Sequence, residues 1–358
     1  MRKPFVSVLI DTYNHERFIE EAIVSALEQD FPASEREILV VDDGSTDRTP
    51  EIVRKFEPHV RLLRKQNGGQ ASAFNAGIPE CQGEIVAFLD GDDWWERKKL
   101  CVVIEEFASH PQIGALGHGF QEVDEGGKPL AVIAPRKGCE SCLRDLKEGS
   151  DFLMLRPFLG TSRLAIRKEI LRQVGQLPDG LVIEADEFLA TVATALGGAR
   201  VLREPLTNYR YHSANLFQFE EWDASKAKRK HESLSCLVNE LPSRLQKAGV
   251  AEKVIRTLTD CVRLDTERLR LSLGNGWPWE TVRVEREANR QAYAGANLGY
   301  HVFHVAVLGT AAVLPPATFY RLRRWYAKRG LARTRQIVGS AQPIPSLAVR
   351  TARAHERE

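Results

Sequence analysis

Three aspartates crowd the end of one apolar run in this 358-residue sequence. The run, residues 85–89, is long enough for one buried strand, and Asp90, Asp92 and Asp93 follow it, with Gly91 allowing a sharp turn between them. Carboxylates held this close repel one another unless a cation joins them. The hard divalent cations Mg²⁺ and Mn²⁺ suit such oxygen ligands and often share their coordination with substrate phosphates. The alternative is a solvated acidic turn.

The elements that must position this cluster alternate between strand and helix signals. Strands are predicted at residues 6–10, 38–41, 60–63 and 85–89, and helices at 18–27, 49–56, 71–81 and 96–109. Helices between strands imply crossover connections, so the predicted fold class is α/β, a mostly parallel sheet flanked by helices. Such sheets bind ligands beyond the carboxyl ends of their strands. Polar clusters at residues 11–14, 42–47 and 90–93 fall there, which favours a binding site over a solvated turn.

The pattern changes in the second part of the chain. A turn at residues 125–128 predicts a hairpin within 113–133. A helix is predicted at 184–196, and a short strand at 200–202. A highly charged helical stretch then covers about 223–273. The sequence therefore predicts an α-helical extension after the α/β part.

The last helical stretch carries an apolar run and then a basic segment. The run, residues 298–314, contains His301 and His304 and falls short of the about 20 apolar residues that a membrane-spanning helix needs. Residues 319–335 are amphipathic and basic. Two interpretations stay open: this region lies on an anionic inner membrane leaflet, or it is a helical pair packed on the catalytic domain or at a homodimer interface.

Bulk composition excludes some classes of function. The 50 Lys and Arg against 48 Asp and Glu leave a net charge of +2, so no overall basic field points to nucleic acid. The N-terminus runs directly into a strand pattern without a signal peptide. Six scattered cysteines fit reduced thiols, and the single pair Cys139 and Cys142 lacks the partners of a closed zinc site. We expect a cytoplasmic protein, peripheral at the inner face of the membrane if the basic segment binds there.

Seven segments resemble, in order and separation, a glycosyltransferase of family 2, whose catalytic domain has the Rossmann-like GT-A fold. They are VSVLIDTYN (6–14), ILVVDDGSTD (38–47), NGGQASAFNAG (67–77), GEIVAFLDGDDWW (83–95), GTSRLAIR (160–167), EADEFL (184–189) and EPLTNYRYH (204–212). One string alone would be weak evidence, but seven in order argue against coincidence. The resemblance implies a catalytic domain, placed at residues 1–220. The sequence pattern places a helical region at 221–335, and we expect a flexible tail at 336–358.

The resemblance also implies a set of residues that bind the donor nucleotide. One of Asp42 and Asp43 would accept a hydrogen bond from the base imide, which favours a UDP or dTDP donor. Phe74 stands where many relatives have arginine, with Lys65 as a substitute cation, and Asp11 stands where the family usually has proline. The donor-binding residues implied are Thr12, Asn14, Glu16, Asp42, Asp43, Asn67, Gly68, Asn75, Asp90 and Gly91.

The catalytic and metal-binding residues are implied in the same way. Asp92 and Asp90 match the family's Asp-x-Asp, which would hold Mn²⁺ or Mg²⁺ on the donor diphosphate, with His212 as a further ligand. Asp186 matches the general base. The nearby acids Glu184 and Glu187 should raise its pKa, although an acidic first turn that complements a helix dipole is the alternative.

The acceptor side is implied less directly. Two consecutive tryptophans could stack on a sugar, or could belong to the hydrophobic core. The residues assigned to this side are Trp94, Trp95, Thr161, Ser162, Glu184 and Arg210.

These residues imply an inverting, metal-dependent transfer of a sugar from a nucleotide diphospho-sugar to a saccharide or lipid-linked acceptor, as in the synthesis of cell-surface polysaccharides. Two other classes stay open. Phe74 and Ala185, which replace expected polar residues, would also suit a non-catalytic nucleotide-sugar-binding subunit. A sugar-nucleotide pyrophosphorylase would need a glycine- and arginine-rich N-terminal loop, which residues 11–14 do not supply.

Overall fold

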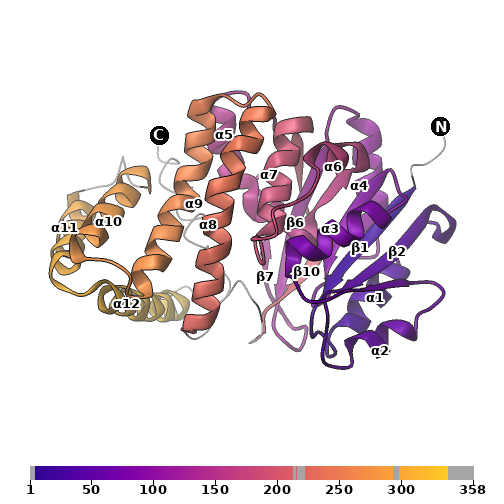
Figure 1. Ribbon diagram of the computed structural model, residues 1–358, viewed down its shortest axis with the longest axis horizontal. Helices are drawn as coiled ribbons and strands as arrows, with labels where there is room; N and C mark the ends of the chain where they lie inside the picture. Colours follow the sequence, from indigo (N-terminus) through magenta and orange to yellow (C-terminus); the bar gives the residue numbers. More distant parts are fainter. Residues whose placement is uncertain (1–4, 213–214, 216–221, 293–297, 338–358) are drawn as a thin grey trace.

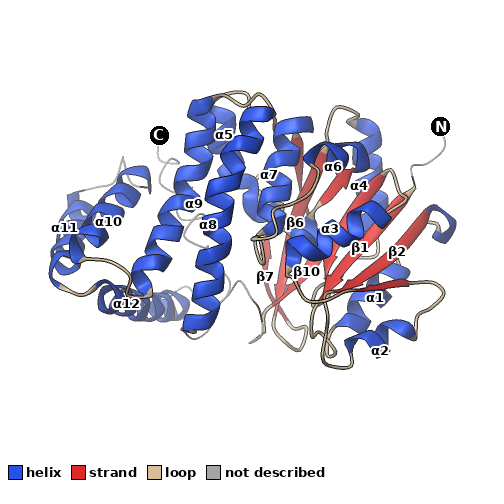
Figure 2. Ribbon diagram, viewed as in Figure 1, coloured by secondary structure: helices blue, strands red, loops and turns tan. Residues whose placement is uncertain are grey.

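The structure is a computed structural model that describes residues 5–212, 215, 222–292 and 298–337. A ten-stranded mixed sheet carries helices on both faces, and the remaining helices extend to one side (Figures 1 and 2). The strands are β1 Val6–Thr12, β2 Arg36–Asp42, β3 Arg61–Arg64, β4 Ile85–Asp90, β5 Trp94–Trp95, β6 Ala115–Val123, β7 Pro129–Ile133, β8 Cys139–Ser141, β9 Ala165–Arg167 and β10 Ala199–Arg210.

The helices account for most of the remaining residues. They are α1 Ile19–Leu27, α2 Thr49–Arg54, α3 Gln70–Glu80, α4 Lys99–Ser109, α5 Leu146–Leu155, α6 Lys168–Val174, α7 Ala185–Gly197, α8 Ala224–Lys247, α9 Glu252–Ser272, α10 Pro278–Ala292, α11 Leu298–Val313 and α12 Pro316–Ile337. Three short 3₁₀ turns are η1 Ala33–Glu35, η2 Arg156–Phe158 and η3 Thr161–Arg163.

The sheet order is β3-β2-β1-β4-β9-β6-β10-β5, with β7 beside β6 and β8 beside β10. The four predicted strands form its parallel half, β3 to β4, and the predicted hairpin is β6 and β7. Beyond β4 the sheet is mixed, because β9 runs antiparallel to both β4 and β6. The predicted strand at 200–202 is the start of the much longer β10. The α/β class is therefore confirmed, with more antiparallel pairing than predicted.

Alternate residues of β1 pack against different helices, as the pleat of a strand requires. Val8 and Ile10 belong to one buried cluster with residues of α1 and α4. Leu9 belongs to a second cluster with residues of α3 and α7. Asp11, which follows Ile10, therefore lies on the same face of the sheet as Leu9, toward α3 and α7.

Helices α8 and α9 stand between the sheet and the α10–α12 group (Figure 1). Leucines of α8 and aliphatic residues of α9 share the buried cluster of α3 and α7, so the hydrophobic core does not divide at residue 220. A smaller separate cluster joins α9 to α10, α11 and α12. The helical stretch predicted at 223–273 is two helices, because the chain turns between them at Gly249, whose φ is +81°.

Two further sequence predictions concern the C-terminal region. No helix within the described residues is long and apolar enough to cross a membrane. The tail predicted at 336–358 lies outside the described residues, apart from its first two positions at the end of α12.

Candidate active site

The ends of β1 and β4 lie side by side and bring Asp11 next to Asp90. The two residues are partners in the parallel register, and the Gly91 amide donates a hydrogen bond to the Asp11 carbonyl (2.9 Å). Only glycine fits at position 91, because a Cβ there would lie 2.6 Å from Oγ1 of Thr12 and 2.8 Å from Nδ1 of His15. The acidic loop after β4 is therefore packed against the residues that follow β1.

Asp92 lies between two histidines. Its Oδ2 is 2.9 Å from Nε2 of His212 and 3.8 Å from Nε2 of His15. The other ring nitrogen of His15 lies 3.2 Å from Oγ1 of Thr12. Burial alone would raise the pKa of Asp92, but the two histidines outweigh it and hold this pKa below its usual value. Asp92 therefore stays ionised at neutral pH.

Asp11 and Asp90 are shifted in the opposite direction. Burial raises the pKa of both carboxyls well above the usual value, and the charges of neighbouring carboxylates, including Asp92 and Asp186, raise it further. Within the described residues, Oδ1 of Asp11 is buried without a hydrogen-bond partner. Burial, with the charge of Asp92, also raises the pKa of Asp93 to about 7. The crevice thus concentrates negative charge, which a bound cation would relieve.

Ser162 holds the acidic loop in place. Its hydroxyl accepts a hydrogen bond from the Asp90 amide (3.0 Å) and donates one to Oδ2 of Asp90 (3.1 Å). The Ser162 carbonyl accepts from the indole of Trp95 (2.9 Å), the ammonium of Lys99 (2.6 Å) and the hydroxyl of Thr207 (2.6 Å). Three buried donors on one carbonyl fix η3 beside the end of β4. The geometry thus gives Ser162 an anchoring role, whereas the resemblance implied an acceptor contact.

Asp186, in the first turn of α7, lies near this acidic cluster, since its charge contributes to the raised pKa of Asp11 and Asp90. Its Oδ2 accepts from the amide (3.0 Å) and the hydroxyl (3.2 Å) of Thr161, and its Oδ1 accepts from the Glu187 amide (2.8 Å). The side chain of Gln70 donates to the Thr161 hydroxyl (2.9 Å) and accepts from the Ala185 amide (3.0 Å). Gln70 therefore joins three elements, α3, η3 and α7, around the carboxylate of Asp186.

Glu184 precedes Asp186 and has an unusual environment. Its backbone is left-handed, with φ +64°, and its side chain is 8% exposed, with a carboxylate oxygen 3.7 Å from Nζ of Lys230. Burial raises the pKa of Glu184 to about 8, with Glu187 and Asp186 raising it further and Lys230 opposing them. The acids of this segment do raise a pKa, but the shift falls on Glu184 and burial is its larger cause.

The loops after β1 and β2 are tied to each other. The Asn14 amide donates to Oγ of Ser45 (2.8 Å), and the Asn14 side chain accepts from the Thr46 amide (2.8 Å). The carboxylate of Glu16 accepts from the Arg48 amide (3.1 Å). Both side chains lie at the position expected for nucleoside contacts, and both also hold these two loops together.

Asp42 and Asp43 are buried at the end of β2 and have different partners. Asp42 accepts from Nε of Arg64 (3.0 Å). Asp43 accepts from the amides of residues 68–69 (2.7–3.1 Å) and from Nζ of Lys65 (2.6 Å). Asp43 therefore positions the glycine turn before α3, and Lys65, expected near the diphosphate, is paired with Asp43.

Comparison with known proteins agrees with this arrangement. Residues 7–172 match the profile of glycosyl transferase family 2, and those residues include the strand ends and the acidic loop described above. Residues 7–172 thus form a domain of glycosyltransferase family 2. An uncharacterized glycosyltransferase of Nostoc, alr2836, is 34% identical over 218 residues, which cover 59% of this chain and 66% of that protein. The chain spans less than two thirds of the length of the curated relatives it matches.

Solved glycosyltransferase structures share the fold. Staphylococcus aureus TarS 1-349 in complex with UDP superposes with a TM-score of 0.52 at 19% identity, covering 89% of this chain and 91% of that one. The mannosyltransferase PcManGT of Pyrobaculum calidifontis, in complex with GDP-Man and Mn²⁺, superposes with a TM-score of 0.50 at 21% identity, covering 91% and 85%. The predicted GT-A fold is therefore confirmed.

The residues of this family 2 domain suit a cation only in part. Among the described residues, no three His, Cys, Asp or Glu side chains are arranged to hold a metal by themselves. Asp92 and His212 nevertheless offer an ionised carboxylate oxygen and an imidazole nitrogen 2.9 Å apart. Mg²⁺ sites commonly use one or two protein carboxylates and take their other ligands from phosphates and water. The donor set thus fits a metal that arrives with a diphosphate.

Two predicted site residues make their contacts within the protein. Both polar atoms of the Asn75 amide bond the backbone of Leu177 (2.8 and 2.9 Å), so Asn75 joins α3 to the loop before α7. Arg210 is 4% exposed and donates to the carbonyls of Asp92 (3.0 Å) and Glu125 (2.8 Å). Its guanidinium therefore braces the acidic loop, whereas the resemblance implied a place on the acceptor side.

The two tryptophans have separate environments. Trp95 is 3% exposed and belongs to a core cluster, so the core-packing alternative holds for it and the stacking interpretation is wrong. Trp94 is partly buried beneath Arg210, whose guanidinium carbon lies 4.5 Å from the ring centre.

Sequence reasoning missed three residues that shape the site: His15, Gln70 and Lys230. His15 and Gln70 stand inside or beside matched segments, directly after Asn14 and Gly69, and their polar side chains at strand-end turns were an available signal. Lys230 lies in a charged helix 46 residues after Glu184, and no local pattern marks it.

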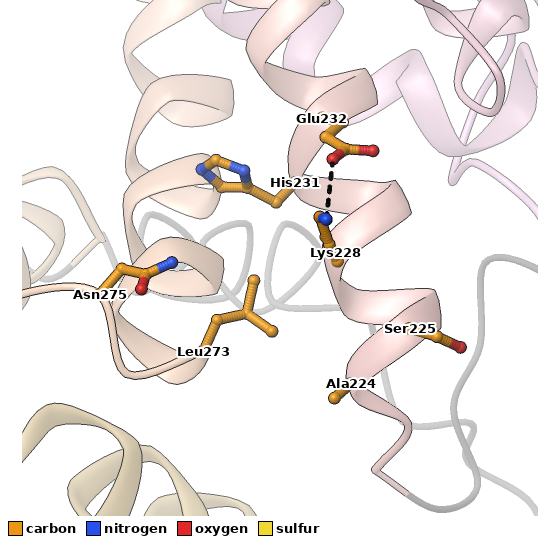
Figure 3. A pocket seen from close by; sticks show the side chains of 7 residues that line it. All are labelled: Ala224, Ser225, Lys228, His231, Glu232, Leu273 and Asn275. Carbon is orange, nitrogen blue, oxygen red and sulfur yellow. Dashed lines mark ion pairs between the residues drawn. The ribbon is translucent and has the colours of Figure 1, made fainter.

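A hollow of about 530 Å³ lies away from this crevice, between the start of α8 and the end of α9 (Figure 3). Lys228 and Glu232 form an ion pair across one wall (3.9 Å), and both side chains are largely exposed. None of the residues assigned to donor, metal or base lines it. The hollow therefore adds nothing to the active site.

Proposed function

We propose that this protein is an inverting, metal-dependent glycosyltransferase that moves a sugar from a nucleotide diphospho-sugar to a hydroxyl of a saccharide or lipid-linked acceptor. The observation that carries the proposal is the convergence of two groups with different tasks. Asp92 and His212 offer ligands for the leaving diphosphate side, and Asp186 faces the same crevice from α7, held by Thr161. Asp90, bonded to Ser162, connects the two groups.

The proposed donor site is formed by the loops that follow β1 and β2. The loops after β1 and β2 hold Thr12, Asn14 and Asp43 where a nucleoside would enter, and the amides of Gly68 and Gly69 face Asp43. A donor of the UDP or dTDP type is favoured because S. aureus TarS, which shares the fold, is in complex with UDP. PcManGT is in complex with GDP-Man, so a guanosine donor is the main competitor in a binding test.

The chemistry assigned to the chain's own residues is a single displacement. The carboxylate of Asp186 takes the proton of the acceptor hydroxyl as its oxygen attacks the anomeric carbon. Thr161 and Gln70 fix the orientation of this carboxylate. The bond to the diphosphate breaks on the opposite side of the sugar, which inverts the anomeric configuration.

Asp92, His212 and Asp90 would hold Mn²⁺ or Mg²⁺ together with the diphosphate. When bound, the metal supplies positive charge that stabilises the negative charge developing on the leaving group. PcManGT, which shares the fold, is in complex with Mn²⁺. Asp90 would lose its proton when the cation arrives, since a nearby positive charge favours the ionised carboxylate.

The acceptor is a saccharide or a lipid-linked saccharide, as in the synthesis of cell-surface glycans. Support comes from S. aureus TarS, which is named a poly(ribitol-phosphate) β-N-acetylglucosaminyltransferase and is 40% identical over 98 residues.

The deciding experiment measures nucleotide binding and transfer on matched variants. In thermal-shift assays with UDP, dTDP and GDP sugars, Mn²⁺-dependent stabilisation should appear for the wild type and Asp186→Asn, and should be lost in Asp92→Asn. Asp186→Asn should lower the transfer rate about 10²–10⁴-fold. Asp179→Asn, an exposed residue of the same segment, is the control and should change neither quantity.

Two outcomes would contradict the proposal in different ways. Unchanged transfer by Asp186→Asn would refute the assignment of the base while leaving the donor site standing. Metal-dependent nucleotide binding by a wild type that neither transfers nor hydrolyses any donor would favour a non-catalytic nucleotide-sugar-binding subunit. An absence of any metal-dependent stabilisation would refute the donor site itself.

A further inference from the structure

Helices α11 and α12 form a surface remote from the sheet. Their main contacts are with α9 and α10, and Figure 1 shows the group at the far side of α8 and α9 from the strands. Helices α11 and α12 thus pack on α9 and α10 and not directly on the strands. The exposed residues of α11 and α12 are therefore available to a binding partner at a distance from the sheet.

The outer side of this group exposes large apolar side chains. At the end of α11, Val313 is 79% exposed. On α12, Leu322, Trp325 and Tyr326 are 45%, 49% and 60% exposed. We call these residues, together with the exposed Arg321 between them, the α12 surface. The spacing of Leu322, Trp325 and Tyr326 places them on one face of α12, and large apolar side chains that share an exposed face indicate a binding surface.

The charge of α12 differs from that of the rest of the chain. Residues 316–337 contain seven Lys and Arg and no Asp or Glu. Outside them, the other 43 Lys and Arg are outnumbered by 48 Asp and Glu. Arg323 is used within the protein, since it pairs with Glu285, while Arg321 is exposed. A basic helix with exposed aromatic residues matches a partner that is both anionic and apolar.

Helix α12 also contacts the chain just before α8. The guanidinium of Arg324 stacks on Trp222, with its carbon 3.7 Å from the ring centre. Trp222 lies ten residues after His212, the imidazole next to Asp92.

We propose that the α12 surface docks on an anionic lipid bilayer. The aromatic side chains would enter the region between headgroups and acyl chains, while the cations contact anionic headgroups. An interfacial position agrees with the length of α11, which at 16 residues is shorter than the about 20 that a span requires. The proposal does not depend on the sugar-transfer activity, since bilayer binding is measured directly.

Sedimentation of the full chain with vesicles tests the proposal. The wild type should bind vesicles that contain phosphatidylglycerol and should bind phosphatidylcholine vesicles at least tenfold more weakly. Raising the salt concentration should weaken the binding, because the attraction between exposed charges is screened. Arg321→Gln should lower the partition coefficient about five-fold, since one basic residue near an anionic surface contributes about 1 kcal/mol.

The matched pair of variants separates apolar insertion from charge. Leu322→Ser with Trp325→Ser should reduce binding to anionic vesicles at least tenfold. Leu130→Ser with Val132→Ser, which changes two exposed apolar residues on β7, should leave it unchanged. Equal reduction by both pairs, equal binding to neutral and anionic vesicles, or no vesicle binding by a properly folded wild type would overturn the proposal. A concentration-dependent dimer that Leu322→Ser with Trp325→Ser abolishes, without vesicle binding, would assign the surface to a second copy.

Discussion

Replacing Glu184 by glutamine should change how the stability of the protein depends on pH. The carboxyl of Glu184 is buried beside Asp186 and Glu187, and its pKa is raised to about 8 from the model-compound value of 4.5. A carboxyl whose pKa is raised on folding binds its proton more tightly in the folded state. Its contribution is therefore complete below pH 4.5 and is lost as the pH rises toward 8.

The size of this effect follows from the shift. Between the two pKa values, each pH unit removes about 1.4 kcal/mol from the free energy of unfolding. From pH 5.5 to 7.5 the wild type should therefore lose up to about 2.7 kcal/mol through Glu184 alone. Glutamine does not titrate, so Glu184→Gln removes this part of the slope. A cost of the substitution that does not vary with pH leaves the slope unchanged.

Thermal unfolding at pH 5.5, 6.5 and 7.5 measures the difference. The melting temperature of Glu184→Gln relative to wild type should rise with pH, by about 5–10 °C over this range for a cooperative unit of 150–250 residues. Glu20→Gln, on the exposed side of α1, should run parallel to the wild type. Parallel curves for Glu184→Gln and wild type would refute the assignment of a raised pKa to this carboxyl.

Two further predictions concern the residues that hold the carboxylates of Asp90 and Asp186. Ser162→Ala removes both hydrogen bonds to Asp90 and should lower the free energy of unfolding by about 1–3 kcal/mol, since buried groups are left unsatisfied; an unchanged chemical-denaturation midpoint would argue against the anchor. Gln70→Ala removes the hydrogen bond that ties Thr161 to α3. It should lower kcat about tenfold or more with little change in the donor KM, because a misplaced base affects the reaction more than binding. Steady-state kinetics in which the donor KM rises while kcat is unchanged would contradict this prediction.

The sequence predicted those parts of the fold that depend on local pattern. Runs of four or five mostly apolar residues between helices identified β1 to β4, and turn residues identified the β6–β7 hairpin. The crevice was predictable as well, because parallel strands place the polar residues that follow them at one edge of a sheet. Asp92 and His212, 120 residues apart in the chain, meet there as the matched segments imply.

The remainder depends on contacts that no local pattern records. The three-residue strand β9 lies between β4 and β6, and a strand this short carries too little periodicity to be identified. The sequence does not tell whether Trp95 faces a sugar or the core. In the structure its indole donates to the Ser162 carbonyl, which also accepts from Lys99, and these buried hydrogen bonds hold Trp95 in the core. Lys230 reaches Glu184 only because α8 packs along α7 and shares its hydrophobic cluster.

The aspartates of the acidic loop after β4 differ in pKa, although they are the same type of residue. Asp90 and Asp92 are two residues apart, yet the pKa of Asp90 is raised by burial beside Asp11, and the pKa of Asp92 is lowered by His15 and His212. Carboxyls whose pKa values are pushed apart by their surroundings can take different tasks in one site. In the proposed metal site, Asp92 would therefore be an oxygen ligand that is charged without a cation. Asp90 holds its proton to higher pH and bonds Ser162, so a bound cation would favour its ionisation.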